Sequence, residues 1–241
     1  MPADPISLPA VVIVTGTSTG VGKTVATAAL TAMLLARGSR VAVVKPAQTG
    51  VGPGEPGDLD EVCRLVGESD RLTYREFVRL GDPLAPAAAA RREGVDLPPV
   101  AAWVGTITEL VGTHDVVLIE GAGGLLVELD SRGGTLADLA AALRYKGISA
   151  AAVIVASPGL GTLNHTALTA EALARRGIPL LGVIVGTWPQ PPHIPDLAMT
   201  ENLADLPRCA DAPLLGVLPD GAGSLSAATF CAGVPDWLVV T

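Results

Sequence analysis

Apolar residues in this chain gather in short, nearly continuous runs, separated by longer segments of mixed polarity. Runs of Val, Ile, Leu and Ala without polar alternation are typical of parallel strands that are buried on both faces. We therefore expect strands from Val11 to the break at Gly16, and at Arg40–Lys45, Asp115–Glu120, Ala150–Ala156, Leu180–Val185 and Leu214–Leu218.

The segments between these runs carry helical patterns. The predicted helices are Val25–Leu35, Asp58–Val66, Leu97–Val111, Thr135–Leu143 and Thr162–Arg176, and Pro46–Gly57 is predicted as a loop. Thr135 is a suitable N-cap residue for the helix that it begins, and Gly177 is suited to end the helix Thr162–Arg176. Strands that alternate with helices predict an α/β fold, with a mostly parallel sheet covered by helices on both faces. No repeat or linker divides the chain, so residues 1–241 are expected to form a single domain.

Composition limits the possible partners. The chain has 241 residues, 49% of them hydrophobic, and a formal net charge of −8 without a basic run. We therefore expect neither nucleic-acid nor membrane binding. Residues 1–9 lack the features of a signal peptide, and no segment reaches the length of a membrane span. Cys63, Cys209 and Cys231 show no metal-binding spacing, which predicts reduced thiols in a cytoplasmic protein.

A glycine-rich segment follows the first predicted strand and leads into a helix. It runs Gly16-Thr-Ser-Thr-Gly20-Val-Gly22-Lys23-Thr24, with one residue more than usual between its first glycine and Gly-Lys. Backbone N–H groups of such a loop face phosphate oxygens, a lysine neutralises them, and a hydroxyl contacts Mg²⁺. The segment predicts a phosphate-binding loop and a P-loop NTPase-like fold; the alternative is a simple turn before a helix.

Charged residues end two of the other predicted strands. Ligands of parallel sheets bind beyond the carboxyl ends of the strands, where Lys45 and Glu120 are found. A lysine that ends an apolar strand is costly to desolvate unless an anion offsets its charge. The plainer alternatives are an exposed lysine at Lys45 and a helix-capping or salt-bridged carboxylate at Glu120.

At this point the motifs support a resemblance to the dethiobiotin synthetases. The matching segments are the loop at 16–24, Val44-Lys-Pro-Ala-Gln-Thr-Gly50, Glu120-Gly-Ala-Gly-Gly-Leu125 and Gly159-Leu-Gly-Thr-Leu-Asn-His-Thr166. Their order along the chain is that of the family. The family closes the ureido ring of dethiobiotin from 7,8-diaminopelargonic acid, CO₂ and a nucleoside triphosphate with Mg²⁺. The resemblance implies a carbamate, its phosphorylation to a mixed anhydride, and attack by the second amine.

The resemblance also implies the catalytic and substrate-binding residues. Lys45 and Lys23 hold the carbamate and the transferring phosphoryl group, and Thr19 lies beside them. Cations are needed there because the carbamate and the triphosphate are both anions. Thr49 and Gly123 contact the substrate.

Further residues are implied for the metal and for a second subunit. Thr24, Asp58 and Glu120 surround Mg²⁺, although spacing alone does not separate Asp58 from its acidic neighbours. Asn164 reaches into the site of the partner subunit and holds the substrate carboxylate, which implies a homodimer; the alternative is local capping by Asn164 and His165.

The nucleotide, ATP or another nucleoside triphosphate, is expected to contact two sets of residues. These are Gly20, Val21, Gly22, Lys23, Thr24, Val25, Asp58, Glu120, Gly121, Ala122 and Gly123, and, towards the base, Gly186, Thr187, Pro219, Asp220 and Gly221. Many family members have an asparagine that recognises the base where this chain has Gly186. Because glycine offers no side-chain donor or acceptor, we expect weak discrimination between bases.

Two other classes share the phosphate-binding loop. A ParA/MinD-like ATPase switch normally carries an extra lysine at the position of Ser18, and the acidic composition also disfavours it. An amidoligase of the cobyrinic acid synthase type normally has an additional glutamine-hydrolysing domain, for which this chain has no room.

Overall fold

A computed structural model describes residues 8–239 of the chain. The N-terminal segment for which no signal peptide is expected therefore lies largely outside the described residues. Within the described range, no helix has both the length and the apolar content needed to cross a membrane.

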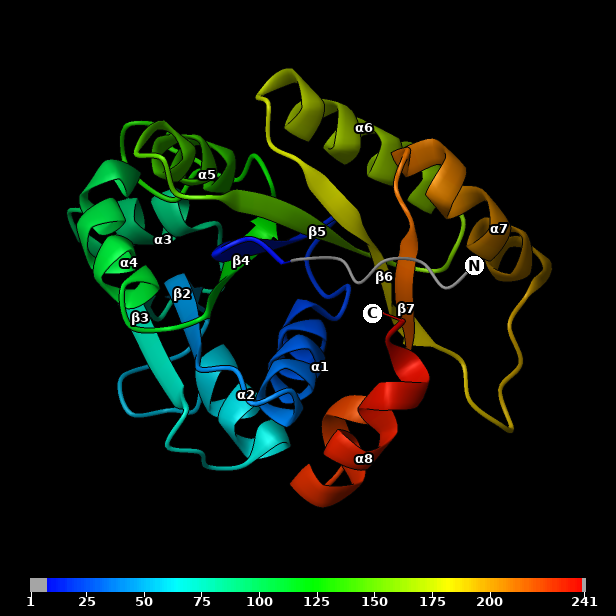
Figure 1. The fold of residues 1–241 in the computed structure, drawn as a ribbon. Coiled ribbons are helices and arrows are strands. Elements are labelled where there is room, and N and C mark those ends of the chain that lie inside the picture. Colours follow the sequence, from blue (N-terminus) through cyan, green and yellow to red (C-terminus); the bar gives the residue numbers. More distant parts are fainter. Residues whose placement is uncertain (1–7, 240–241) are drawn as a thin grey trace.

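One sheet forms the centre of the molecule (Figure 1). Its strands are β1 (Val11–Gly16), β2 (Val41–Thr49), β3 (Leu72–Leu80), β4 (Val116–Gly124), β5 (Ala150–Ala156), β6 (Leu180–Trp188) and β7 (Leu214–Pro219). Their order is β3-β2-β4-β1-β5-β6-β7, and neighbouring strands pair in parallel. The predicted fold class is confirmed, and β1 lies in the middle of the sheet.

Helices cover both faces of this sheet. The α-helices are α1 (Lys23–Ala36), α2 (Asp58–Val66), α3 (Pro86–Glu93), α4 (Val104–Val111), α5 (Leu136–Tyr145), α6 (Thr162–Arg175), α7 (Leu197–Ala210) and α8 (Ala227–Trp237). Short 3-10 helices are η1 (Val100–Trp103) and η2 (Ala222–Ser224). In Figure 1, α1, α2 and α8 lie on one side of the sheet, and α4 to α7 lie on the other.

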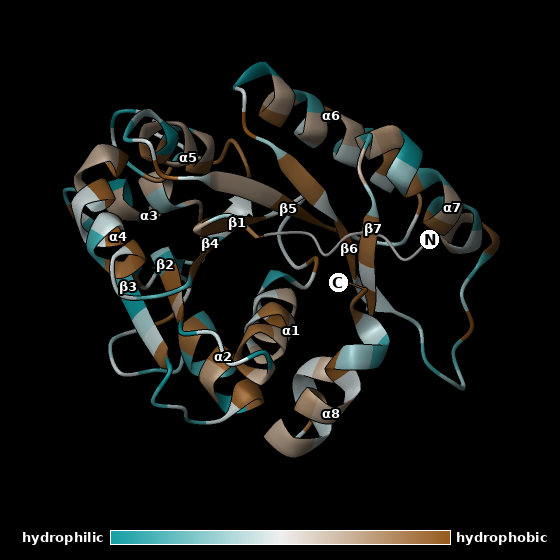
Figure 2. Cartoon of the chain, in the orientation of Figure 1, coloured by the Kyte–Doolittle hydropathy of each residue, from teal (hydrophilic) through white to brown (hydrophobic). Residues whose placement is uncertain are grey.

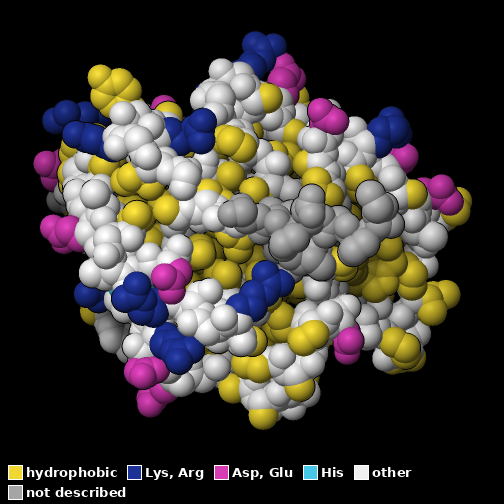
Figure 3. All heavy atoms as spheres, viewed as in Figure 1, with side chains coloured by type: hydrophobic (Ala, Val, Ile, Leu, Met, Phe, Trp, Pro, Cys, Tyr) yellow, Lys and Arg dark blue, Asp and Glu magenta, His cyan; other side chains and the backbone are white. Residues whose placement is uncertain are grey.

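The alternating residues of β1 show how the two core layers arise. Val12 and Val14 pack with α1, α2 and α8, whereas Val11 and Ile13 pack with the helices of the opposite face. Both faces of a central strand are therefore apolar, which explains the continuous apolar runs in the sequence. Figure 2 shows the same arrangement, with largely hydrophobic strands and hydrophilic residues on the outer turns of the helices. On the face shown in Figure 3, basic and acidic side chains are interspersed around the rim.

Several predicted boundaries are wrong. The strands β4 and β6 extend beyond their predicted ends at Glu120 and Val185, to Gly124 and Trp188. The segment from Pro46 continues β2 to Thr49, because β2 still pairs with β3 there after its pairing with β4 has ended at Val44. A proline is tolerated where one side of a strand has no partner. The helix expected from Leu97 begins instead as η1 and then α4, since Pro98 and Pro99 disfavour a regular helix before them.

Several elements were not predicted at all. These are β3, α3, α7 and α8. The edge strand β3 mixes apolar residues with Arg75 and Glu76 and is only half-buried, so it lacks the apolar run of the central strands. The helices α7 and α8 contain Pro207 and Pro235, which are unfavourable in helix interiors.

Candidate active site

A cavity of about 740 Å³ opens at the carboxyl ends of β1, β2 and β4. Its walls come from the loop before α1, the end of β2, the first residue of α2, the loop before α3 and the end of β4. This volume falls in the range of small-molecule sites, and the position is the one expected for a ligand of a parallel sheet.

The loop between β1 and α1 forms one wall of the cavity. Gly22 is the N-cap of α1 with φ 92°, a conformation that favours glycine, and no side chain caps this helix. The N–H groups of the first turn therefore remain available to an anion. Lys23 is 8% exposed, and its Nζ donates a hydrogen bond to the carbonyl of Ser18 at 3.2 Å. Gly20, Thr24 and Val25 also line the cavity, and Val21 is buried beneath the loop.

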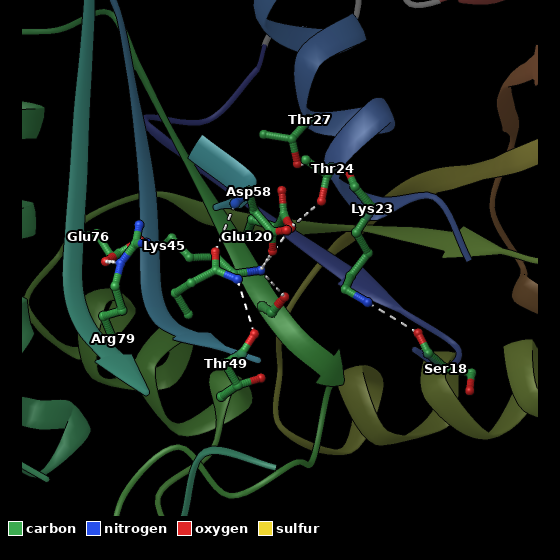
Figure 4. Close-up of polar contacts among 12 residues, drawn as sticks. Ser18, Lys23, Thr24, Thr27, Lys45, Thr49, Asp58, Glu76, Arg79 and Glu120 are labelled. Atoms are coloured by element: carbon green, nitrogen blue, oxygen red, sulfur yellow. Dashed lines mark hydrogen bonds and ion pairs between the residues drawn. The ribbon is translucent and has the colours of Figure 1, made fainter. Parts of the chain in front are cut away.

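Opposite this loop, Lys45 lies between two carboxylates (Figure 4). Its Nζ is 2.9 Å from Glu120 Oε1, forms an ion pair with Asp58, and donates to the carbonyl of Gly121 at 3.2 Å. Lys45 is 3% exposed and Glu120 is 1% exposed. The lysine is therefore buried and paired, which excludes the alternative of an exposed lysine at a strand end.

Glu120 connects Lys45 with the phosphate-binding loop. Its Oε1 also accepts a hydrogen bond from Thr24 Oγ1 at 3.0 Å, whereas its Oε2 is buried without a hydrogen-bond partner. A buried carboxylate oxygen without a partner is costly unless a cation or a donor reaches it. Among residues 8–239, no three His, Cys, Asp or Glu side chains gather as a metal site. The cavity has two carboxylates, those of Asp58 and Glu120, and the hydroxyl that contacts Glu120 is that of Thr24.

The charges of these groups influence one another. Burial opposes the charge of Lys45, but Glu120 and Asp58 raise its pKa above the usual value. Burial and the nearby charge of Lys45 lower the pKa of Lys23. For Asp58, burial favours the neutral form, yet the ammonium of Lys45 brings the pKa below its usual value. Both lysines line one cavity, and each is within electrostatic reach of the other.

Other predicted residues complete the wall. Thr19, Thr49, Ala122 and Gly123 line the cavity, whereas Gly121 is buried and contributes its carbonyl to Lys45. The segment from Pro83 to Pro86, which leads into α3, also lines the cavity together with Val127, and neither was predicted from the sequence. In the sequence this segment is a short apolar stretch flanked by prolines. Its position in the fold can be predicted only if β3, the strand before it, is recognised.

The residues expected near the base lie outside this cavity. Gly186, Thr187, Pro219, Asp220 and Gly221 are at the ends of β6 and β7. Gly186 lies against the phosphate-binding loop, because a Cβ there would be 1.9 Å from the carbonyl oxygen of Val21. The glycine is therefore required by the close approach of two backbones, a reason that the sequence does not reveal.

Asn164 also lies apart from the cavity of its own chain. It is exposed in the first turn of α6, and it is absent from the residues that line the cavity.

Comparisons with known proteins agree with the motifs. A family model described as an AAA domain matches residues 10–225. The ATP-dependent dethiobiotin synthetase BioD of Streptomyces coelicolor is 53% identical over 228 residues, which cover 95% of this chain and 91% of the relative. Its counterpart from Frankia casuarinae is 56% identical over 223 residues, covering 91% and 88%. The one from Rhodococcus jostii is 50% identical over 227 residues, covering 94% of each.

Solved structures show similarity in fold alone. The cell division ATPase MinD of Pyrococcus furiosus aligns with a TM-score of 0.55 at 19% identity, covering 95% of this chain and 98% of that one. Chloroplast FtsY from Physcomitrella patens aligns with a TM-score of 0.53 at 19% identity, covering 95% and 65%. At this identity a shared fold does not carry function. These three relatives, each at least 50% identical over most of its length, share one name, and this chain belongs to the dethiobiotin synthetase family.

Proposed function

We propose that this chain is a ligase that closes the ureido ring of dethiobiotin from 7,8-diaminopelargonic acid and CO₂ at the expense of ATP, as a step of biotin biosynthesis. The observation that carries the proposal is the position of Lys45, which is buried in the same cavity as the phosphate-binding lysine Lys23. Such a site presents two ammonium groups to two anionic reactants, a carbamate and a triphosphate.

Lys45 and Lys23 have complementary roles in this proposal. Lys23, at the start of α1, neutralises the transferring phosphoryl group together with the free N–H groups of the first helical turn. Lys45 holds the carbamate oxygens, and its raised pKa keeps it charged at neutral pH. Thr19 and Thr49 face the same cavity and supply hydroxyl donors to the reacting groups.

We propose Thr24, Asp58 and Glu120 as the residues that hold Mg²⁺. The unpartnered Oε2 of Glu120 and the hydroxyl of Thr24 are oxygen ligands of the kind that this ion prefers, and one or two carboxylates are usual in nucleotide sites. When bound, Mg²⁺ would neutralise charge on the phosphates. Asp58 and Glu120 also form ion pairs with Lys45, so the same two carboxylates contact both the proposed metal ion and the lysine that binds the substrate.

We further propose a homodimer of single-domain subunits, in which Asn164 completes the substrate site of the partner. Asn164 is exposed, and the flanking Leu160 and Leu168 are 92% and 56% exposed. Exposed leucines on both sides of a polar residue favour a surface that another chain covers. The free thiols Cys63, Cys209 and Cys231 support a cytoplasmic location.

The test of the function is the dependence of turnover on the substrates. Purified protein is incubated with ATP and Mg²⁺, and phosphate release and dethiobiotin are measured together. We expect phosphate release only when diaminopelargonic acid and bicarbonate are both present, with one dethiobiotin formed for each phosphate. Hydrolysis that proceeds without these substrates and is stimulated by DNA or lipid vesicles would instead indicate an ATPase switch.

A further inference from the structure

The first turn of α2, which carries Asp58, is held by a side chain from a neighbouring strand. The N-cap of this helix is Gly57, which has no side chain to accept a hydrogen bond from the exposed N–H groups. Gln48, near the end of β2, supplies the acceptor: the N–H of Asp58 donates to Gln48 Oε1 at 2.8 Å. The backbone of Asp58 is thereby tied to the strand that carries Lys45.

Gln48 is itself fixed in place. It is 4% exposed, and its Nε2 donates to the carbonyl of Thr49 at 3.2 Å. These two bonds assign the amide, with the oxygen towards Asp58 and the nitrogen towards Thr49. Gln48 is thus a buried polar side chain with a defined orientation, on the wall of the cavity.

Arg79 supports the same segment from β3. It pairs with Gln48 in the register of the two strands, and its Nη1 donates to the carbonyl of Glu55 at 2.5 Å. Its Nε and Nη2 donate to the carboxylate of Glu76 at 2.7 and 2.9 Å (Figure 4). Arg79 therefore holds the loop before α2 while Gln48 holds the start of the helix.

Gly57 fits between these two side chains. A Cβ at this position would lie 2.9 Å from Gln48 Oε1 and 3.0 Å from Arg79 Nη2. Its φ of −108° does not require glycine. A side chain at this position would instead displace the ends of Gln48 and Arg79, and so disturb the contact that Gln48 makes with Asp58.

We propose that Gln48 is a positioning residue for Asp58: its amide oxygen fixes the backbone of Asp58 and so directs that carboxylate towards Lys45 and the metal side of the cavity. The inference rests on the proposed role of Asp58 as a metal ligand. A carboxylate on a short side chain has few rotatable bonds, so its position follows that of its backbone. Replacing the acceptor leaves the N–H of Asp58 without a partner and frees the first turn of α2.

The experiment compares Gln48→Met, Asp58→Asn and the double variant in the full-length protein. Gln48→Met keeps the length of the side chain but removes its acceptor, and Gln190→Met makes the same change at an exposed residue outside the cavity. Two quantities are measured: the Mg²⁺ concentration for half-maximal dethiobiotin formation, and the hydrogen exchange rate of the Asp58 amide by NMR without nucleotide.

For Gln48→Met we expect a roughly three- to tenfold higher Mg²⁺ requirement, as for the loss of one helix-capping bond. The Asp58 amide should exchange about tenfold faster. Adding Gln48→Met to Asp58→Asn should leave the Mg²⁺ requirement unchanged, because the residue acts through Asp58. Gln48→Glu retains an acceptor oxygen and should restore protection of the amide, and Gln190→Met should behave as wild type.

Three results would overturn the inference. Unchanged amide exchange in Gln48→Met would mean that the contact does not hold the helix. If the Mg²⁺ requirement of the double variant rises by the product of the two single effects, Gln48 acts directly on a ligand and not through Asp58. Both results leave the proposed function intact. If Asp58→Asn itself has a normal Mg²⁺ requirement, the metal assignment fails, and the proposed role of Gln48 fails with it.

Discussion

Replacing Lys45 by methionine tests the proposed site most directly, because the change removes the ammonium and nearly preserves the volume of the side chain. In the structure, Lys45 Nζ is 2.9 Å from Glu120 Oε1 and also contacts Asp58. At an effective dielectric constant of about 20, one such pair attracts by about 6 kcal/mol. Desolvation offsets part of this attraction, and breaking a buried pair typically costs about 3–5 kcal/mol.

For Lys45→Met we expect a loss near the lower end of that range, about 3 kcal/mol of unfolding free energy, when no Mg²⁺ is added. The hydroxyl of Thr24 still donates to Glu120, which reduces the loss of unfolding free energy. Urea unfolding followed by circular dichroism measures it. Mg²⁺ with nucleotide should recover most of the difference, since a divalent cation gives both carboxylates a counter-charge.

The same variant separates catalysis from nucleotide binding. Loss of a group that stabilises developing negative charge typically lowers kcat about 100- to 1,000-fold. We expect a loss of this size in dethiobiotin formation, with nucleotide affinity by calorimetry within about threefold of wild type, because Lys23 and the start of α1 remain. Lys146→Met, an exposed lysine at the end of α5, is the matched control. Activity of Lys45→Met near that of Lys146→Met would refute the reasoning, as would a loss of nucleotide binding that accounts for the whole defect.

Four further predictions concern the partner subunit, the base, the packing of Gly186 against the loop before α1, and the stability of the loop after β4. Mixing Lys45→Ala with Asn164→Ala protein should restore up to about a quarter of wild-type activity at low substrate, because each heterodimer regains one intact shared site; no recovery would place Asn164 in its own subunit's site or outside any. ATP, CTP and GTP should support comparable rates, and a strict ATP requirement would contradict this. Gly186→Ala should weaken nucleotide binding at least tenfold by displacing the loop, which calorimetry measures. Asp130→Asn should lose about 2–4 kcal/mol in urea at pH 7, because a buried carboxylate accepting three backbone N–H groups is replaced. Burial opposes its ionisation, but those N–H groups hold the pKa of Asp130 below its usual range. Its stabilisation is therefore complete above about pH 4 and lost as the pH falls through the lower folded pKa, so the difference between wild type and variant should shrink in acid.

The sequence allowed the central part of the site to be predicted for a physical reason. Buried parallel strands are apolar along their length, so a polar residue at the carboxyl end of one marks the edge where ligands bind. Lys45 and Glu120 end the apolar runs of β2 and β4, although the strands themselves continue to Thr49 and Gly124, and the structure places the two side chains in contact. The glycine-rich loop was recognisable because its backbone conformation requires glycine, as Gly22 shows.

Gln48 and the wall at 83–86 could not be predicted in the same way. Both depend on β3, an edge strand that is half-buried and mixes charged with apolar residues, so that no periodic pattern marks it. Gln48 lies in register with Arg79 of that strand, and the wall follows its end. A residue whose role depends on a neighbour from an unrecognised strand has no signal of its own in the sequence.

The missing side chain of Gly186 has two consequences, one for recognition of the base and one for backbone packing. From the sequence, its missing side chain indicated weak recognition of the base. In the structure, the backbone of β6 comes so close to Val21 that any Cβ would collide with the loop. A side chain that recognises the base from this position therefore requires the loop and the strand to lie farther apart. Because the loop and the strand are close together here, we expect that Gly186→Asn alone does not create a preference for ATP and weakens the binding of every nucleotide to a similar extent. A variant that became selective for ATP while keeping its affinity would show that the loop can move aside, and that the missing side chain alone governs the choice of base.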